Sequence, residues 1–202
     1  MSLNIYMLYE NLSNTLGSLM SKSHDVGFFI SGGLDSSVLL YACCNIKQYT
    51  TGNARLQAFT IPTGQDVVAA QRVICWMEQR FNIEIDQTVV EFDSNLHHSL
   101  RVRSALSVGS QMCDYILLGD TTNPSHLPNG PERVRSTHRK FIQPFFEWTK
   151  QDVVALIKEI NIPNELIALT NSCAIDGACG QCWECYERAW GFAVNGIADP
   201  KL

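Results

Sequence analysis

One short segment constrains the fold of this chain more than any other, because residues 28–38 read FFISGGLDSSV. The apolar start is typical of a buried strand, and the apolar residues that resume at Val38 favour a helix. Two adjacent glycines allow a tight turn between strand and helix, where backbone N–H groups and hydroxyls can surround a phosphate. The segment therefore predicts a strand–loop–helix unit that binds a phosphate-bearing ligand. The other interpretation is an ordinary glycine-rich turn capped by Asp35.

The residue types in this loop separate it from other phosphate-binding loops. It has no lysine at the position where a Walker loop needs one. Ser-Gly-Gly-x-Asp-Ser instead resembles the PP-loop of ATP pyrophosphatases, which cleave ATP between the α and β phosphates. This resemblance implies Asp35 and Ser36 as catalytic residues. The residues predicted to bind the nucleotide are Ser31, Gly32, Gly33, Leu34, Asp35, Ser36, Ser37 and Gly119.

Apolar, partly β-branched runs alternate with helical patterns along the chain, which predicts an α/β fold with a doubly wound, parallel, five-stranded sheet. We expect one domain over residues 1–202, with a helical extension at 1–25 and a zinc-binding tail at 170–192. Apolar spacing in the extension suits either a cover for the sheet or a contact in a homodimer. The expected strands are 26–30, 56–61, 85–92, 115–118 and 141–145.

Two helices are predicted most clearly. After Gly64, Gln65 and Asp66, an apolar stripe recurs at helical spacing and should pack on the sheet. A second helix is predicted over 153–160, because Thr149 and Asp152 form a capping-box pattern at its start. The stripe of the first helix comprises Val67, Ala70, Ile74, Met77 and Phe81.

Composition limits the classes of protein that remain. A net charge of −5 argues against a generally electropositive protein that coats nucleic acid, and favours small substrates. We find no run of about 18 uncharged apolar residues, and polar residues interrupt positions 1–20 where a signal peptide needs an apolar core. We therefore expect a cytoplasmic protein without membrane or nucleic-acid partners.

The stretch 119–140 is the longest that lacks a helix or strand pattern. A loop of this length in a compact domain is usually functional or disordered. Because ligands bind beyond the carboxyl ends of parallel strands, the loop suits a lid over the site. The alternative is a surface excursion whose basic residues contact only water. Those residues are Arg133, Arg135, Arg139 and Lys140.

The eight cysteines fall into two groups. Cys173, Cys179, Cys182 and Cys185 lie within thirteen positions and predict one tetrahedral Zn²⁺ site of structural type, since four thiolates leave no open position for a substrate. An iron–sulfur cluster is the second interpretation. The other group is expected to consist of small buried apolar side chains without chemistry, and comprises Cys43, Cys44, Cys75 and Cys113.

Taken together, residues 27–196 resemble the 7-cyano-7-deazaguanine synthase family, the PP-loop enzymes of queuosine and 7-deazaguanine biosynthesis. The tail TNSC at 170–173, followed by CGQCWEC at 179–185, carries the most specific part of the resemblance. The segment after Gly119 departs from the family, so the chain is expected to be a divergent member. The other matching elements are the Ser31–Ser37 loop, Gly64-Gln65, Leu118-Gly119, Arg188 and Gly191-Phe192.

The resemblance implies an ATP-dependent ligase that converts 7-carboxy-7-deazaguanine to the nitrile with ammonia. ATP, Mg²⁺ near Asp35 and Zn²⁺ would be its cofactors. Adenylation turns a carboxylate, a poor electrophile, into a mixed anhydride that ammonia can attack. Three alternatives stay open: a relative that activates another carboxylate, on a 7-deazapurine or a protein; a PP-loop tRNA-modifying enzyme; and a nucleotide-binding accessory protein without turnover.

Overall fold

The computed structural model describes residues 5–62, 66–90, 98–127, 130–173, 175 and 178–201. The strands are β1 (Asp25–Phe29), β2 (Arg55–Thr60), β3 (Ile85–Val89), β4 (Tyr115–Leu117) and β5 (Phe141–Ile142). The helices are α1 (Ile5–Lys22), α2 (Leu34–Lys47), α3 (Asp66–Phe81), α4 (His98–Met112), α5 (Lys150–Glu159), α6 (Asn164–Leu169) and α7 (Trp183–Val194).

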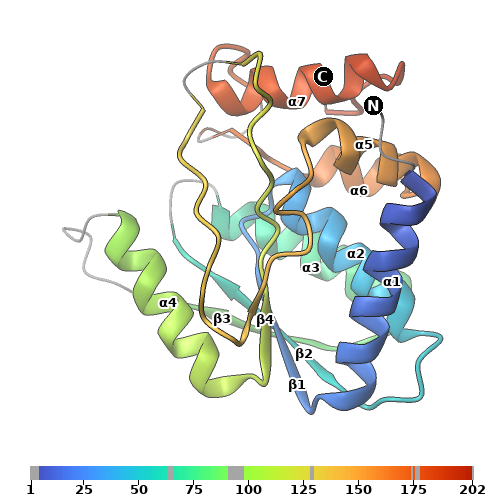
Figure 1. The fold of residues 1–202 in the computed structure, drawn as a ribbon, viewed down its shortest axis with the longest axis vertical. Helices are drawn as coiled ribbons and strands as arrows, with labels where there is room; N and C mark the ends of the chain where they lie inside the picture. The colour runs from blue at the N-terminus through green and yellow to red at the C-terminus, as the bar shows by residue number, and fades with distance from the viewer. Residues whose placement is uncertain are drawn as a thin grey trace.

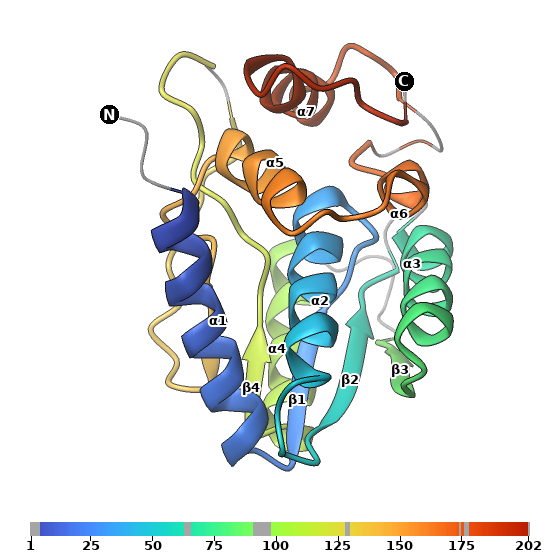
Figure 2. The ribbon, with the colours of Figure 1, turned by 90° about the vertical axis from the view of Figure 1, so that its right-hand side faces the viewer.

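The strands form one sheet in the order β3-β2-β1-β4-β5, and every neighbouring pair is parallel. The predicted doubly wound parallel sheet is therefore confirmed. Helices α1, α2 and α3 lie on one face of the sheet and α4 on the other (Figure 1). Helix α7 lies across the edge where the strands end, with α5 and α6 beneath it (Figure 2). In parallel sheets this edge is where ligands bind.

The strands begin near the predicted positions. The third, expected over 85–92, ends at Val89, and residues 91 and 92 lie outside the described residues. The fifth differs more clearly. We expected a strand over 141–145, whereas β5 ends at Ile142. Pro144 has no N–H to donate to a ladder, and the chain instead makes turns in which Phe146 N–H donates to the Gln143 carbonyl (3.2 Å). Phe145 is nevertheless fully buried, because it packs in the main core below α5.

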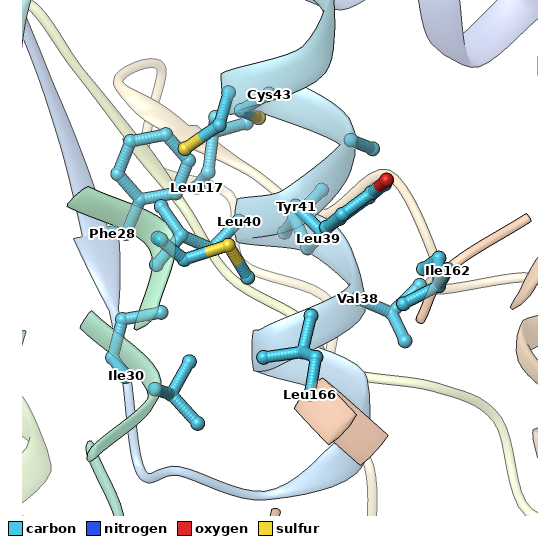
Figure 3. Packing of buried hydrophobic residues seen from close by; sticks show 14 of the residues in the cluster. Phe28, Ile30, Val38, Leu39, Leu40, Tyr41, Cys43, Leu117, Ile162 and Leu166 are labelled. Atoms are coloured by element: carbon cyan, nitrogen blue, oxygen red, sulfur yellow. The ribbon is translucent and has the colours of Figure 1, made fainter. Parts of the chain in front are cut away.

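Helix α2 is buried along most of its length. The sheet covers one side, and α1, α3 and α5 contact the others. Side chains from β1, β4 and α2 meet in the main core, where Phe28 and Leu117 lie close to the helix (Figure 3). Because the helix is covered all round, both Cys43 and Cys44 are buried, as predicted. Burial raises the pKa of both thiols, which keeps them protonated and unreactive.

Helix α1 answers the question that the sequence left open about the N-terminal extension. Leu12, Leu16 and Met20 recur on one side of the helix and are buried against α2 and α5. The apolar stripe thus packs within the chain, whereas Tyr6 and Met7 on the first turns are exposed. A homodimer stays a prediction. No helix in the described part of the chain has the length and apolar character needed to cross a membrane.

The two clearest helix predictions are confirmed. In α3, four of the five predicted stripe residues are buried and Val67 is half-buried. Thr149 is the N-cap of α5 and forms the predicted capping box, with its N–H donating to the Asp152 carboxylate (2.8 Å). One prediction about α3 is wrong: Cys75 is exposed, because it lies on the solvent side of the stripe. Gly64 and Gln65 lie outside the described residues.

Candidate nucleotide site and four-cysteine centre

The loop from Ser31 to Ser37 turns the chain from β1 into α2. Gly32 makes the turn with a φ of 75°, a conformation that favours glycine. Gly33 is the N-cap of α2 and accepts three hydrogen bonds through its carbonyl oxygen, from Ser37 N–H (3.1 Å), Ser37 Oγ (2.7 Å) and Ser36 Oγ (3.2 Å). The turn therefore directs the N-terminus of α2 at the edge where the strands end.

The first turn of α2 is suited to an anion. N–H groups at a helix N-terminus have no partners within the helix, and the helix dipole is positive there. Gly33 as N-cap contributes no side chain to satisfy them. The Ser31 hydroxyl lies beside this turn, accepting from Gly33 N–H (3.2 Å) and lying 3.5 Å from the Ser36 hydroxyl. The arrangement offers N–H and O–H donors to a phosphate group.

A cavity of about 500 Å³ opens beside this loop at the carboxyl edge of the sheet. Its volume is in the range usual for small-molecule sites. Six of the eight predicted nucleotide-binding residues line it, while Gly32 and Ser37 are absent from its described walls. The Ser37 side chain is instead fully buried within the turn. The predicted residues in the wall are Ser31, Gly33, Leu34, Asp35, Ser36 and Gly119.

The cavity is lined by both apolar and polar side chains. The polar wall includes four carboxylates and two cationic side chains, and it combines residues from both ends of the chain. The apolar side chains are Phe29, Ile30, Leu34, Phe59, Ile61, Val102, Leu106, Leu118 and Val134. The charged residues are Asp35, Asp120, Arg133, Lys150, Glu184 and Glu187. Such a pocket suits a flat apolar group joined to a charged one.

Lys150 is one of the cavity residues that sequence reasoning missed, as is Glu187. It is the first residue of α5 and is only 4% exposed, yet its Nζ forms an ion pair with Asp35 Oδ2 and lies 3.4 Å from Glu187 Oε2. Burial raises the pKa of Glu187, an effect that Lys150 opposes and Asp35 reinforces. A buried ammonium needs such partners, because an isolated charge in the interior is strongly destabilising.

The tail of the chain contacts the Ser31–Ser37 loop directly. Asn171 N–H donates to the Gly32 carbonyl (2.8 Å), and the Asn171 amide donates to the carbonyls of Cys173 (2.7 Å) and Ile175 (2.9 Å). Asn171 is 6% exposed and lines the cavity. One side chain thus joins the glycine loop to the start of the cysteine segment.

Several buried oxygens around the cavity have no hydrogen-bond partner among the described residues. They are Asp35 Oδ1, Asn171 Oδ1, Ser172 Oγ and Glu187 Oε1. A buried polar group without a partner costs about 1–3 kcal/mol. These atoms therefore favour a ligand, or ions and water that come with it, beside them in the cavity.

Part of the loop at 119–140 lines the cavity, whereas its role as a lid stays a prediction. Arg133, the first of its four basic residues, lines the cavity and lies over the Trp183 ring, 6.0 Å from the centroid. The other three are not among the cavity-lining residues: Arg135 pairs with Glu147, Lys140 donates to the carbonyls of Ser110 and Cys113, and Arg139 is exposed. His126 of the same loop packs edge to face on the ring of Trp190, further along α7. The described part of the loop rests on α7 and closes one side of the cavity.

The four clustered cysteines come together as predicted. Their Sγ atoms all lie within 4.8 Å of one another, with Cys179 to Cys185 at 3.8 Å and Cys173 to Cys182 at 3.9 Å. Tetrahedral Zn²⁺ with Zn–S bonds of about 2.3 Å would hold its sulfurs about 3.8 Å apart. The donor set and its spacing thus fit one tetrahedral ion. An iron–sulfur cluster would need room for several atoms between the thiolates.

The backbone prepares one of these thiols for metal binding. N–H groups of Gln181 (3.4 Å) and Cys182 (3.3 Å) donate to Cys179 Sγ and lower the pKa of that thiol to about 6. Burial raises the pKa of the Cys182 and Cys185 thiols. A cation among the four sulfurs would favour the thiolate form of each, so metal binding and deprotonation are coupled.

Two family models divide the chain between them. The model described as asparagine synthase matches residues 7–121, more than half of the chain. The chain belongs to the asparagine synthase family. The model described as queuosine biosynthesis protein QueC matches residues 122–196, which contain Lys150 and the four cysteines. Together the matches support a QueC-like PP-loop ATP pyrophosphatase, an ATP-using enzyme of the carbon–nitrogen ligase type with adenylation-type activity.

Solved structures share the fold at low sequence identity. The NH3-dependent NAD synthetase from Campylobacter jejuni is 17% identical, with a TM-score of 0.52 over 82% of this chain and 77% of the synthetase. The U34-tRNA thiolase NcsA from Methanococcus maripaludis, which carries a [4Fe-4S] cluster, is 15% identical, with a TM-score of 0.55 over 92% of this chain and 70% of the thiolase. The curated proteins include no significant sequence match.

Proposed function

We propose that this protein is an ATP-dependent synthase that adenylates a carboxylate and substitutes ammonia, with 7-carboxy-7-deazaguanine as acceptor and 7-cyano-7-deazaguanine as product. One observation carries the proposal: a single cavity is lined by residues of both matched segments. Ser31, Asp35 and Gly119 come from the asparagine synthase match, whereas Lys150 and Asn171 come from the QueC match.

The chemistry accounts for the use of ATP. A carboxylate oxygen attacks the α-phosphorus, the bond to the β-phosphate oxygen breaks, and pyrophosphate leaves. Ammonia then attacks the acyl carbon and AMP leaves, which yields an amide and a proton. A second ATP activates the amide oxygen in the same way, with release of pyrophosphate, and loss of AMP and two protons from the activated amide gives the nitrile. No protein nucleophile is required in this sequence, so positioning and electrostatics supply the rate enhancement.

The proposed roles follow from the positions of the side chains. The N–H groups at the start of α2 and the hydroxyls of Ser31 and Ser36 would bind the pyrophosphate portion of ATP. Ser37 would support the turn from inside rather than contact the nucleotide. The Lys150 ammonium lies beside Asp35 at the start of α2, where it would face the negative charge that develops on the phosphates.

Asp35 suits a magnesium ligand. Its Oδ1 is buried and has no hydrogen-bond partner among the described residues, Asp35 lines the cavity, and carboxylate oxygen is a ligand that Mg²⁺ prefers. When bound, Mg²⁺ would neutralise part of the charge on the triphosphate. Asp35 would then exchange its ion pair with Lys150 for the metal, leaving the lysine available to the nucleotide.

The cysteine centre is proposed to hold Zn²⁺ in a structural role. Its four thiolates would complete a tetrahedral shell and leave no open position for chemistry. Because Cys182 is the N-cap of α7 and Cys185 lies in its first turn, the ion would fix the start of the helix that supplies Glu184 and Glu187 to the cavity.

The tRNA thiolase alternative receives less support from the cavity. A thiolase that uses cysteine chemistry needs a reactive thiol beside the nucleotide. No cysteine is among the described residues of the cavity wall. Burial raises the pKa of Cys113 to about 12, and Cys75 lies exposed on α3. Likeness to the thiolase structure concerns the fold alone.

The test is a product assay with ATP, Mg²⁺, an ammonium salt and 7-carboxy-7-deazaguanine, followed by mass spectrometry. Formation of the nitrile, with the amide as a transient species, would support the proposal. If an adenylate forms with a different carboxylate and not with 7-carboxy-7-deazaguanine, the proposed use of ATP stands and the proposed acceptor is wrong. Nucleotide binding without breakdown under any acceptor would favour an accessory protein.

A further inference from the structure

Lys150 reaches the cavity because two helices cross at this residue. Helix α5 begins at Lys150, immediately after the Thr149 cap, and α7 passes over it. Gly191 of α7 makes the close crossing possible, since a Cβ atom there would lie 2.8 Å from Lys150 Cγ and 3.0 Å from the Lys150 carbonyl oxygen. One turn before this crossing, Glu187 directs its carboxylate at the Lys150 ammonium.

Glu187 is an unusual residue for its position. It is 2% exposed, on the side of α7 that faces the chain interior, where an apolar side chain would be expected. Only Oε2 has a partner in the described structure, at 3.4 Å from Lys150, and Oε1 has none. A half-satisfied buried carboxylate destabilises the fold, so stability alone does not explain this residue.

The two carboxylates beside Lys150 differ in what else they can do. Asp35 belongs to the glycine loop and is part of the proposed nucleotide site, so its pairing with Lys150 changes when the nucleotide binds. Glu187 belongs to a separate helix, α7, and approaches the same ammonium. When Asp35 turns to the nucleotide, Glu187 remains as the anion that keeps the ammonium in the cavity rather than in solvent.

We propose that Glu187 is a positioning residue, which holds the Lys150 ammonium at the phosphate end of the cavity before and during nucleotide binding. The part of this inference that concerns nucleotide binding rests on the proposed function. The part that concerns the position of Lys150 rests on the ion pair alone. Glu187 acts through Lys150 and contacts no reacting atom itself.

Three variants separate positioning from folding. Glu187→Gln removes the charge and keeps the shape, Glu187→Asp keeps the charge on a shorter side chain, and Tyr186→Phe changes an exposed neighbour on the same turn. Metal content and Tm are measured for each protein, so that a loss caused by the cysteine centre or by unfolding is recognised. Tyr186→Phe should match the wild type in every assay.

The first measurement needs no turnover. Lys150 is modified with an amine-reactive acetylating reagent and quantified by mass spectrometry. Glu187→Gln should raise the modification rate about threefold or more, with Glu187→Asp in between, because the ammonium is less firmly held. An unchanged rate in Glu187→Gln would overturn the inference, whether or not the protein proves to be a synthase.

The second measurement is steady-state pyrophosphate release. Glu187→Gln should raise KM for ATP roughly fivefold or more, whereas a merely smaller folded fraction lowers the maximal rate and leaves KM unchanged. If the wild-type protein releases pyrophosphate and Glu187→Gln has the same KM for ATP, the inference is overturned and the proposed function stands. A wild type that releases no pyrophosphate would instead refute the proposed function, and the modification rate would still decide the role of Glu187.

Discussion

The ammonium of Lys150, at the start of α5, forms an ion pair with the carboxylate of Asp35, 115 positions earlier in the first turn of α2. This pair joins the two matched segments at the carboxyl edge of the sheet. In the absence of nucleotide each charge neutralises the other. The pair therefore marks the place where the proposed site must reorganise when ATP and Mg²⁺ enter.

Replacing Asp35 with asparagine should abolish turnover and leave folding nearly intact. The amide keeps the size of the side chain but loses the charge that would hold Mg²⁺, so we expect kcat to fall at least about 100-fold. Asp114→Asn is the matched control, since Asp114 accepts from His24 N–H (2.8 Å) at the opposite edge of the sheet. Pyrophosphate release checks both variants. Substantial activity in Asp35→Asn would refute the role of the loop.

Replacing Lys150 with methionine should lower kcat/KM for ATP by about 100-fold, because the buried cation of the polar wall is lost. Methionine keeps an aliphatic side chain against Gly191, so the crossing of α5 and α7 should survive. Circular dichroism and Tm establish that the variant is folded. If the folded variant keeps the wild-type kcat/KM, Lys150 serves only the structure.

These two residues show where sequence reasoning succeeds and where it stops. The Ser31–Ser37 turn is encoded by neighbouring residues, so glycines and hydroxyls predict it directly. The pairing of Lys150 with Asp35 depends on how distant segments pack, which no local pattern contains. A weak signal was present: a lysine in the first turn of a helix opposes the helix dipole. Glu187 on the buried side of α7 was a second one.

The same distinction explains the remaining outcomes. The four clustered cysteines lie close in sequence, so their convergence could be predicted from spacing. The exposure of Cys75 could also have been predicted, because it follows Ile74 of the apolar stripe by one residue and its side chain is therefore turned about 100° away from the core. The early end of β5 follows from Pro144, a local signal that we underweighted.

Replacing Cys182 with serine should release the metal and destabilise the tail. We expect zinc content near one per chain in the wild type and near zero in the variant. Tm should fall by roughly 5 °C or more, the shift that a loss of about 2 kcal/mol produces in a chain of this size. Cys75→Ser, outside the cluster, is the control and should keep its metal. A stable, active, zinc-free Cys182→Ser protein would contradict the structural role.

Replacing Arg188 with methionine should destabilise the fold by about 3–5 kcal/mol, because it leaves the buried carboxylate of Asp199 without its cationic partner. Arg188 donates twice to Asp199 (2.6 and 2.8 Å) and once to Thr170 Oγ1 (2.7 Å). Urea denaturation measures the effect. Arg55→Gln is a surface control.

In that control, the Arg55 ion pair with Asp25 (2.8 Å) has a largely exposed guanidinium, so its removal should lower the free energy of unfolding far less than the loss of Arg188 does. If the free energy of unfolding falls equally in the two variants, the buried ion pair of Arg188 does not stabilise the C-terminal segment as we expect.

The most direct test of the account is to identify the ATP fragments by ³¹P NMR while the purified protein turns over with Mg²⁺, ammonium and 7-carboxy-7-deazaguanine. We predict AMP and pyrophosphate, formed only when the acceptor is present and abolished in Asp35→Asn. ADP and inorganic phosphate as the primary products would contradict the account, because they would show cleavage at the γ-phosphate rather than between the α and β phosphates.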